Sequence, residues 1–339
     1  MTLKRLYLTV AAVVACLPAV YCQDGSTAYQ FLNITSSARI YALGGTNITL
    51  VDDDITTADQ NPALYGQEMS GQVSLNYMRY VGGSNFAGVG YAHSVGSHGT
   101  LAGTIRYFGY GSMKETDAMG NILGTFSPKD LSFGLSYSHD IADRLRGGIS
   151  LKGVYSGYAD YSAFAVATDL GLNYFNEERD MSLSVVVANL GGQVKKFENR
   201  HDRLPVDVML GWSKTLGTTP VRLSITAHHL NKWHLPYYES GDGTEQGEFR
   251  KKDKFMSNLM RHLVFGVDLV SSPNWYLGLG YNYKTRTDMS TYSRSFVSGF
   301  SIGAGINVRT FAFGIALAQP HTGATTCMFN LRCNLSELL

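Results

Sequence analysis

Residues 206–213 read Val-Asp-Val-Met-Leu-Gly-Trp-Ser, and this stretch shows the pattern that decides the fold. Its even-numbered residues, Val206, Val208, Leu210 and Trp212, are all apolar. Successive side chains of a strand point to opposite faces, so the alternation gives one apolar face and one different face. From Val73 to the C-terminus the same rhythm recurs, in segments of about ten residues separated by turn-forming clusters. Many such strands behind a secretory signal are typical of a transmembrane β-barrel.

The pattern predicts an all-β chain, an outer-membrane antiparallel β-barrel of about fourteen strands. An even number of strands is usual in bacterial outer-membrane barrels. The strands are expected near residues 72–80, 85–94, 100–109, 130–140, 147–157, 161–175, 181–190, 204–215, 220–231, 260–270, 274–285, 297–306, 310–318 and 324–335.

The connections between these strands alternate in length. Every second one is short, at residues 95–99, 141–146, 176–180, 216–219, 271–273 and 307–309. The intervening loops are mostly longer and include residues 110–129, 191–203, 231–257 and 286–296. Outer-membrane barrels have short periplasmic turns and long outer loops. The alternation therefore supports the strand count and places both termini on the periplasmic side.

Residues 1–22 are predicted to be a signal peptide. Lys4 and Arg5 form a charged start, and the apolar stretch 6–14 is too short to span a bilayer as a helix. We expect cleavage after Cys22, followed by export to the periplasm and insertion into the outer membrane. Lipidation at Cys16 is the alternative, because Val-Val-Ala-Cys at 13–16 resembles a lipobox.

The composition argues against nucleic-acid binding and is consistent with a membrane barrel. A formal net charge of +1 gives no bulk electrostatic attraction to nucleic acid. Tyrosine (21 residues) and glycine (37) are abundant, as aromatic girdles and tight turns require. Cys327 and Cys333 share one face of the last predicted strand. At about 3.3 Å per residue they lie roughly 20 Å apart, too far for a disulfide.

Residues 29–70 lack the strand rhythm. Unpaired backbone is costly in lipid, so this segment is expected to lie inside the barrel, where about fourteen strands leave room for a plug. We therefore predict a hatch over residues 23–70 and a barrel over residues 71–339.

A series of short motifs runs through the mature chain in a specific order. The motifs are Phe31-Leu32-Asn33, Ser37-Ala38-Arg39, Ala42-Leu43-Gly44-Gly45, Val51-Asp52-Asp53-Asp54, Asn61-Pro62-Ala63-Leu64, Ser74-Leu75-Asn76-Tyr77, Asn189-Leu190-Gly191 and Thr226-Ala227-His228-His229-Leu230. Together they resemble the PorQ-like (PorV/PorQ) outer-membrane proteins of the type IX secretion system of Bacteroidetes. The Asn-Pro-Ala element also resembles the wider FadL-like superfamily of long-chain fatty-acid transporters, in which it lies in the hatch.

The resemblance implies a fourteen-stranded barrel with an N-terminal hatch. It also implies a non-enzymatic role in protein secretion, in which the barrel anchors a partner of the cargo-attachment complex at the cell surface. The implied partners are a PorZ-like surface protein and the attachment complex with PorU and PorV. That complex links cargo to anionic lipopolysaccharide. The alternative, implied by the superfamily, is an outer-membrane transporter of hydrophobic small molecules.

Two places in the hatch are candidate sites. Pro62 restricts Asn61 to extended geometry, so that Asn61 can hydrogen-bond nearby backbone in a turn. We expect Asn61, Pro62 and Ala63, with Gly44 and Gly45, to shape or gate the hatch. The run Asp52, Asp53 and Asp54 lacks the spacing of an EF-hand loop. A capping turn and a weak divalent-ion site both remain open for it.

No catalytic or metal motif has the right context. Gly-Phe-Ser-Ile-Gly at 299–303 places Ser301 in an alternating strand, whereas a nucleophile elbow needs a strand, a turn and a helix. His228 and His229 are adjacent in a predicted strand, so their side chains should point to opposite faces. We therefore predict no enzyme activity, no cofactor and no metal site.

The most polar loop, residues 231–257, is the candidate docking surface for a partner at the cell surface. Its charged residues include Glu245, Glu248, Arg250, Lys251 and Lys252. A solvated loop tip is the alternative interpretation of this charge cluster.

Overall fold

The computed structural model describes residues 27–197, 201–217, 219–240, 249–272, 274–288, 297–321 and 324–337, and all statements below concern these residues. The predicted signal peptide, with Cys16 and Cys22, lies outside them. No helix within the described residues is long and apolar enough to cross a membrane.

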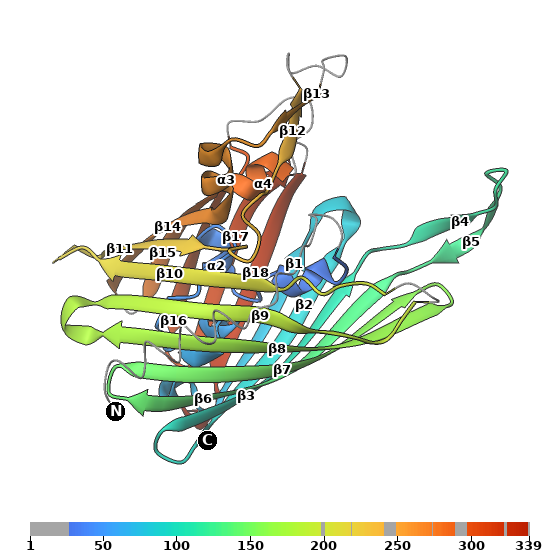
Figure 1. The fold of residues 1–339 in the computed structure, drawn as a ribbon. Coiled ribbons are helices and arrows are strands. Elements are labelled where there is room, and N and C mark those ends of the chain that lie inside the picture. The colour runs from blue at the N-terminus through green and yellow to red at the C-terminus, as the bar shows by residue number, and fades with distance from the viewer. Residues whose placement is uncertain are drawn as a thin grey trace.

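Within the described residues, fourteen antiparallel strands form one closed barrel (Figure 1). It closes where β1 pairs with β18, from Gln72 opposite Asn334 to Arg79 opposite Cys327. The barrel strands are β1 (Gln72–Arg79), β2 (Asn85–Val95), β3 (Gly99–Gly109), β6 (Lys129–Ala142), β7 (Leu145–Tyr158), β8 (Tyr161–Asn176), β9 (Met181–Lys195), β10 (Asp207–Thr215), β11 (Val221–Ala227), β14 (Leu263–Ser272), β15 (Trp275–Asn282), β16 (Phe300–Val308), β17 (Phe311–His321) and β18 (Ala324–Asn334). Each overlaps a predicted strand, so the predicted architecture is confirmed.

The barrel is apolar outside and polar inside. On β10 the outward residues include Leu210, which is 47 % exposed, whereas Asp207 and Ser213 are buried toward the lumen. Cys327 lies on the outward face of β18, and Cys327 and Cys333 are both free thiols, as their spacing predicted. This distribution is the reverse of that in a water-soluble protein, and it suits strands that face lipid.

The hatch lies inside the barrel, as predicted (Figure 1). It is built from short elements because frequent Gly, Pro and Asp residues interrupt any longer helix. They are η1 (Gln30–Asn33), α2 (Ala38–Ala42), η2 (Ile55–Ala58), η3 (Pro62–Leu64) and η4 (Gln67–Met69). Helix α2 packs against β15 to β18, and η3 packs on the opposite side against β6 to β8.

One end of the barrel carries the short turns and the C-terminal end of the described chain, whereas Thr27, at its N-terminal end, pairs with Arg203 in a long connection at the other end. The other end carries the long connections. Residues 110–129 and 231–257 were predicted to be loops, but the structure forms strands and helices there. Two hairpins project there (Figure 1), and two helices lie beside the second. These elements are β4 (Met113–Thr116) with β5 (Ile122–Phe126), β12 (Tyr237–Ser240) with β13 (Phe249–Lys252), α3 (Phe255–His262) and α4 (Tyr283–Asp288). Single 3₁₀ turns η5 (Val81–Gly83), η6 (Glu177–Arg179) and η7 (Leu335–Glu337) complete the fold.

Candidate functional site

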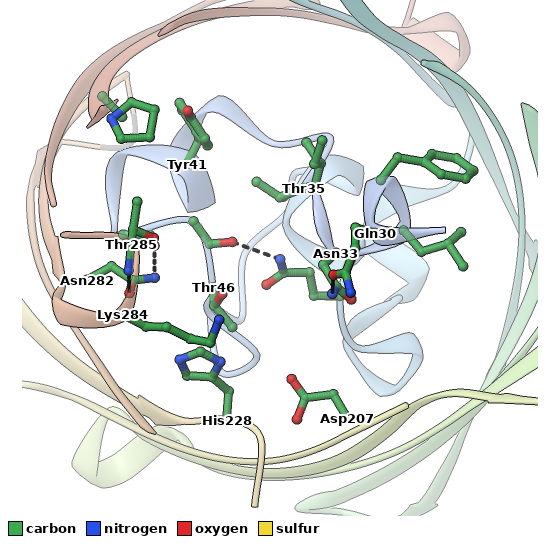
Figure 2. Close-up of a pocket in the computed structure, with 18 of the residues that line it drawn as sticks. Gln30, Asn33, Thr35, Tyr41, Thr46, Asp207, His228, Asn282, Lys284 and Thr285 are labelled. Carbon is green, nitrogen blue, oxygen red and sulfur yellow. Dashed lines mark hydrogen bonds between the residues drawn. The ribbon is translucent and has the colours of Figure 1, made fainter. Parts of the chain in front are cut away.

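A cavity of about 530 Å³ lies between the hatch and the barrel wall, toward the end with the long loops. Its floor is the hatch, from Gln30 to Thr35 and from Gly44 to Thr46. Its walls come from strand ends around the barrel, so residues far apart in the sequence face one another across it (Figure 2).

One wall of the cavity is aromatic. Phe108, at the end of β3, forms ring contacts with Phe31 of the hatch, Tyr80 and Tyr110, at centroid distances of 6.4, 6.0 and 4.7 Å. All four residues line the cavity. We call them the aromatic row. Tilted and edge-on rings of this kind favour binding of apolar or aromatic molecules. The sequence alone does not reveal this row, because its members are dispersed over three regions of the chain and no local pattern links them.

The opposite wall is polar. Asp207 and His228 project from neighbouring strand ends toward the cavity, and the Lys284 ammonium lies beside the His228 ring (Figure 2). Lys284 also pairs with Asp288 at 2.5 Å. Burial lowers the pKa of His228 well below its usual value, and the neighbouring His229 adds to this effect, so the imidazole is neutral at pH 7. The cavity thus combines the aromatic row with charged groups, which also include the Arg106–Asp59 and Lys152–Asp169 ion pairs.

The predicted placement of the two histidines is wrong. Strand β11 ends at Ala227, four residues before its predicted end, and His229 has a left-handed φ of 56°. The chain therefore turns at this point, and the two imidazole rings lie 4.5 Å apart instead of on opposite faces. His229 Nδ1 lies 3.0 Å from Asp207 Oδ2. A strand register cannot reveal this turn, because the change of backbone conformation occurs at a single residue.

The Asn61-Pro62-Ala63 element fastens the hatch to the wall. Asn61 is extended, with φ −141°, and its side chain donates to Ile48 O at 2.8 Å and accepts from Ala63 N at 3.0 Å. Two wall glycines make room for it. A Cβ on Gly148 would overlap the Pro62 carbonyl, and one on Gly171 would overlap the Asn61 amide oxygen. None of the three motif residues lines the cavity.

Gly44 and Gly45 lie at the cavity floor, where φ angles of 99° and 83° favour glycine. Gly44 N donates to Ser301 Oγ at 3.0 Å, and Ser301 Oγ donates to Ala42 O at 2.8 Å. Ser301 therefore anchors the hatch from within β16. The serine of the Gly-x-Ser-x-Gly match has no strand–turn–helix context, as the sequence indicated.

The three aspartates at 52–54 have separate roles. Asp52 pairs with Arg39 of α2, Asp53 pairs with Arg332 of β18 at 3.4 Å, and Asp54 caps η2 by accepting from Thr56 N at 2.9 Å. The Asp52 carboxyl is partly buried, which would raise its pKa, but the Arg39 guanidinium holds that pKa below the usual value. Partial desolvation and the hydrogen bond that its protonated carboxyl donates to the Asp52 carboxylate raise the pKa of Asp53 to about 6. In the structure, these three carboxylates therefore stabilise the hatch and its attachment to the barrel wall.

Of the five docking candidates, Glu245 and Glu248 lie outside the described residues. Arg250, Lys251 and Lys252 lie on β13 in the projecting hairpin (Figure 1), and none of them lines the cavity. The Lys251 side chain is 54 % exposed, and its Nζ lies 3.7 Å from Asp253 Oδ2.

Comparisons with known proteins place the fold. No protein-family model matches the chain, and no curated protein sequence matches it. The structure is similar to that of the toluene transporter TodX of Pseudomonas putida, with a TM-score of 0.50 and 9 % identity over 88 % of this chain and 97 % of that one. The monoaromatic hydrocarbon channel CymD has a TM-score of 0.48 and 10 % sequence identity, over 88 % of this chain and 96 % of that one. A Pseudomonas aeruginosa FadL homologue has a TM-score of 0.46 and 11 % sequence identity, over 88 % of this chain and 97 % of that one.

The chain has a closed fourteen-stranded barrel fold similar to that of TodX. At this level of identity the likeness concerns the fold and not the ligand.

Proposed function

We propose that this protein is an outer-membrane channel that takes up small molecules with an apolar body and a polar head. The observation that carries the proposal is the cavity above the hatch, with the aromatic row on one wall and Lys284, His228 and Asp207 on the other. Its volume of about 530 Å³ falls within the usual range of small-molecule sites. TodX and CymD, which share the architecture, are described as a toluene transporter and a monoaromatic hydrocarbon channel.

Membrane location follows from the surface. The outward side chains of the strands are large and apolar, including Leu75, Phe133 and Ile315, which are 43–52 % exposed. Such a surface is stable in lipid and would aggregate in water. Residues 1–22 would direct export, and the end with the long loops would face the outside of the cell.

Passage requires movement of the hatch. Buried contacts join it to strands on opposite sides of the lumen, through α2 and η3. Asn61 with Pro62 and Ala63, and Gly44 with Gly45, would set the resting position of the hatch, since Pro62 lies against Gly148 and Gly44 lies against Gly280 and Ser301 of the wall. The cavity then acts as the entry site, and hatch displacement completes transport.

The test combines recovery of bound molecules with uptake. Untagged protein is purified from outer membranes, and small molecules extracted from it are identified by mass spectrometry. Proteoliposomes are then assayed for uptake of toluene and of oleate. Phe108→Ala should reduce recovery and uptake, whereas Phe133→Ala, on the outer face of β6, should not. Equal uptake by protein-free liposomes would refute the transport function.

A second candidate function is anchoring of a partner in type IX secretion, as the motif resemblance implies. The observation that favours it is the projecting hairpin β12–β13 with α3, which exposes Tyr238, Phe255 and Met256. Exposed apolar side chains among charged ones suit a protein contact. The proposed partners are a PorZ-like surface protein and the attachment complex with PorU and PorV, acting next to anionic lipopolysaccharide.

This candidate has its own test. The protein is isolated from mildly solubilised outer membrane, and copurifying proteins are quantified by mass spectrometry. A stoichiometric surface protein that is lost in Tyr238→Ser/Phe255→Ser, but not in a hairpin β4–β5 variant such as Ile122→Ser, would support anchoring. Recovery of the barrel alone would refute it.

A further inference from the structure

A compact group of ligand-type side chains lies in the polar wall of the cavity. Asp207, His228 and His229 each offer a ligand atom, and these atoms lie within 4.8 Å of one another. It is the only such group found among the described His, Cys, Asp and Glu residues. All three residues line the cavity, so a ligand could reach them from the lumen.

An unsatisfied buried nitrogen points to a missing partner. His228 is 5 % exposed, and its Nε2 atom has no hydrogen-bond partner among the described residues. Burying such a polar atom without a partner costs roughly 1–3 kcal/mol. A metal ion in the cavity would satisfy Nε2.

The geometry is close to that of a metal site. Two ligands at about 2.0–2.1 Å from a tetrahedral ion lie roughly 3.3 Å apart. His229 Nδ1 and Asp207 Oδ2 are 3.0 Å apart, so this pair needs little movement. Asp207 is also oriented from behind, since its Oδ1 accepts from the backbone N of His229. Hydrogen bonds to a liganding carboxylate are typical of protein metal sites.

The donor set selects the class of ion. Two imidazole nitrogens and one carboxylate oxygen suit Zn²⁺ and similar transition-metal ions, whereas Ca²⁺ and Mg²⁺ prefer all-oxygen sites. Three protein ligands beside an open cavity leave a coordination position for water or for a bound molecule. The Lys284 ammonium beside the His228 ring opposes a second positive charge, although Lys284 is paired with Asp288.

We propose that Asp207, His228 and His229 bind one transition-metal dication such as Zn²⁺ in the lumen wall. The ion ties the end of β10 to the turn after β11 and presents an open coordination position to the cavity. Lys284 limits its affinity. This site is independent of the transport function, because it requires only the local geometry.

The test measures Zn²⁺ binding directly. Untagged, folded protein in detergent is titrated with Zn²⁺ and analysed by calorimetry and by elemental analysis after dialysis, with Co²⁺ absorption as a report of coordination. We expect one ion per chain. Asp207→Asn and His228→Asn should each weaken binding at least about tenfold. His234→Ala is the matched control, since that histidine is 74 % exposed and pairs with Asp253 outside the group.

Lys284→Met supplies an independent readout. Removing its charge should tighten Zn²⁺ binding, a change that a nonspecific surface site would not show. Absence of stoichiometric Zn²⁺ in the wild-type protein would overturn the proposal even if the ligand variants fail to fold. Equal binding by wild-type, Asp207→Asn and His228→Asn protein would overturn it as well. Loss of the metal site with unchanged uptake in liposomes would leave the channel function standing.

Discussion

Arg39 of the hatch donates to Asp268 on β14 through two nitrogens, at 2.6 and 3.1 Å, and both side chains are buried. The guanidinium also pairs with Asp52 and lies 4.5 Å from the ring centre of Tyr276. Two further ion pairs, Arg106 with Asp59 and Arg332 with Asp53, join the hatch to β3 and β18. Buried ion pairs therefore hold the hatch at β14 and β3, and Arg332 adds a contact at β18 through the backbone carbonyl of Asp53 at 3.0 Å.

Breaking the Arg39–Asp268 pair should loosen the hatch. Removing one partner leaves a buried charge uncompensated, at a cost of about 3–5 kcal/mol. We expect Arg39→Met to lower the urea midpoint of unfolding in detergent and to increase ion conductance in planar bilayers. Arg144→Met is the control, because its partner Glu178 is exposed and such surface pairs contribute little. Unchanged midpoint and conductance in Arg39→Met would contradict this view of the hatch.

The wall glycine beneath Asn61-Pro62 should not tolerate a side chain. In Gly148→Ala the new methyl group would overlap the Pro62 carbonyl, and overpacking of this kind costs about 1–3 kcal/mol. Gly103→Ala, on β3, is the matched control, because its Cβ would have no atom within 4 Å. Thermal unfolding followed by heat-modifiable gel migration distinguishes the two. Equal stabilities would show that the hatch shifts freely at this contact.

Asp53 should make the hatch sensitive to pH. Its folded-state pKa of about 6 is raised above the usual 3.8, so its contribution to stability is complete below about pH 4 and is lost as the pH rises through 6. Asp53→Asn cannot ionise and keeps the backbone contacts of Asp53 O with Gln72 and Arg332. We therefore expect the variant to gain stability relative to wild type between pH 4 and pH 8, measured by urea unfolding. A difference in stability between the variant and wild type that stays constant from pH 4 to pH 8 would contradict the raised pKa of Asp53.

The aromatic row should determine affinity for apolar ligands. Phe108→Ala removes its central ring, and the loss of aromatic contact predicts a Kd increase of about tenfold for a monoaromatic probe such as toluene. Phe108→Leu, which keeps apolar volume, should lose less. Equilibrium binding in detergent measures both. A Kd that is the same in Phe108→Ala and in the outer-face variant Phe133→Ala would place the ligand elsewhere.

The barrel was largely predictable, because the side chains of each strand alternate between residues that face lipid and residues that face the lumen. On β10 the alternation of Leu210 with Met209 and Gly211 reports the lipid and lumen sides in a few residues. The hatch was also predictable as a segment without rhythm, and the Asn61-Pro62 turn follows from the restricted geometry before proline. Small hairpins in the long loops escaped prediction, since no buried face enforces a pattern there.

The sequence by itself determined the closed sheet, the hatch and the separation of short turns from long loops, because these depend on side-chain alternation and on local turn chemistry. Only the tertiary structure decided the cavity and its walls. Phe31 meets Phe108, and Asp207 meets His228 and His229, because barrel closure and one left-handed residue bring distant segments together. Such meetings depend on register and backbone conformation summed around the barrel, which no single stretch of sequence contains.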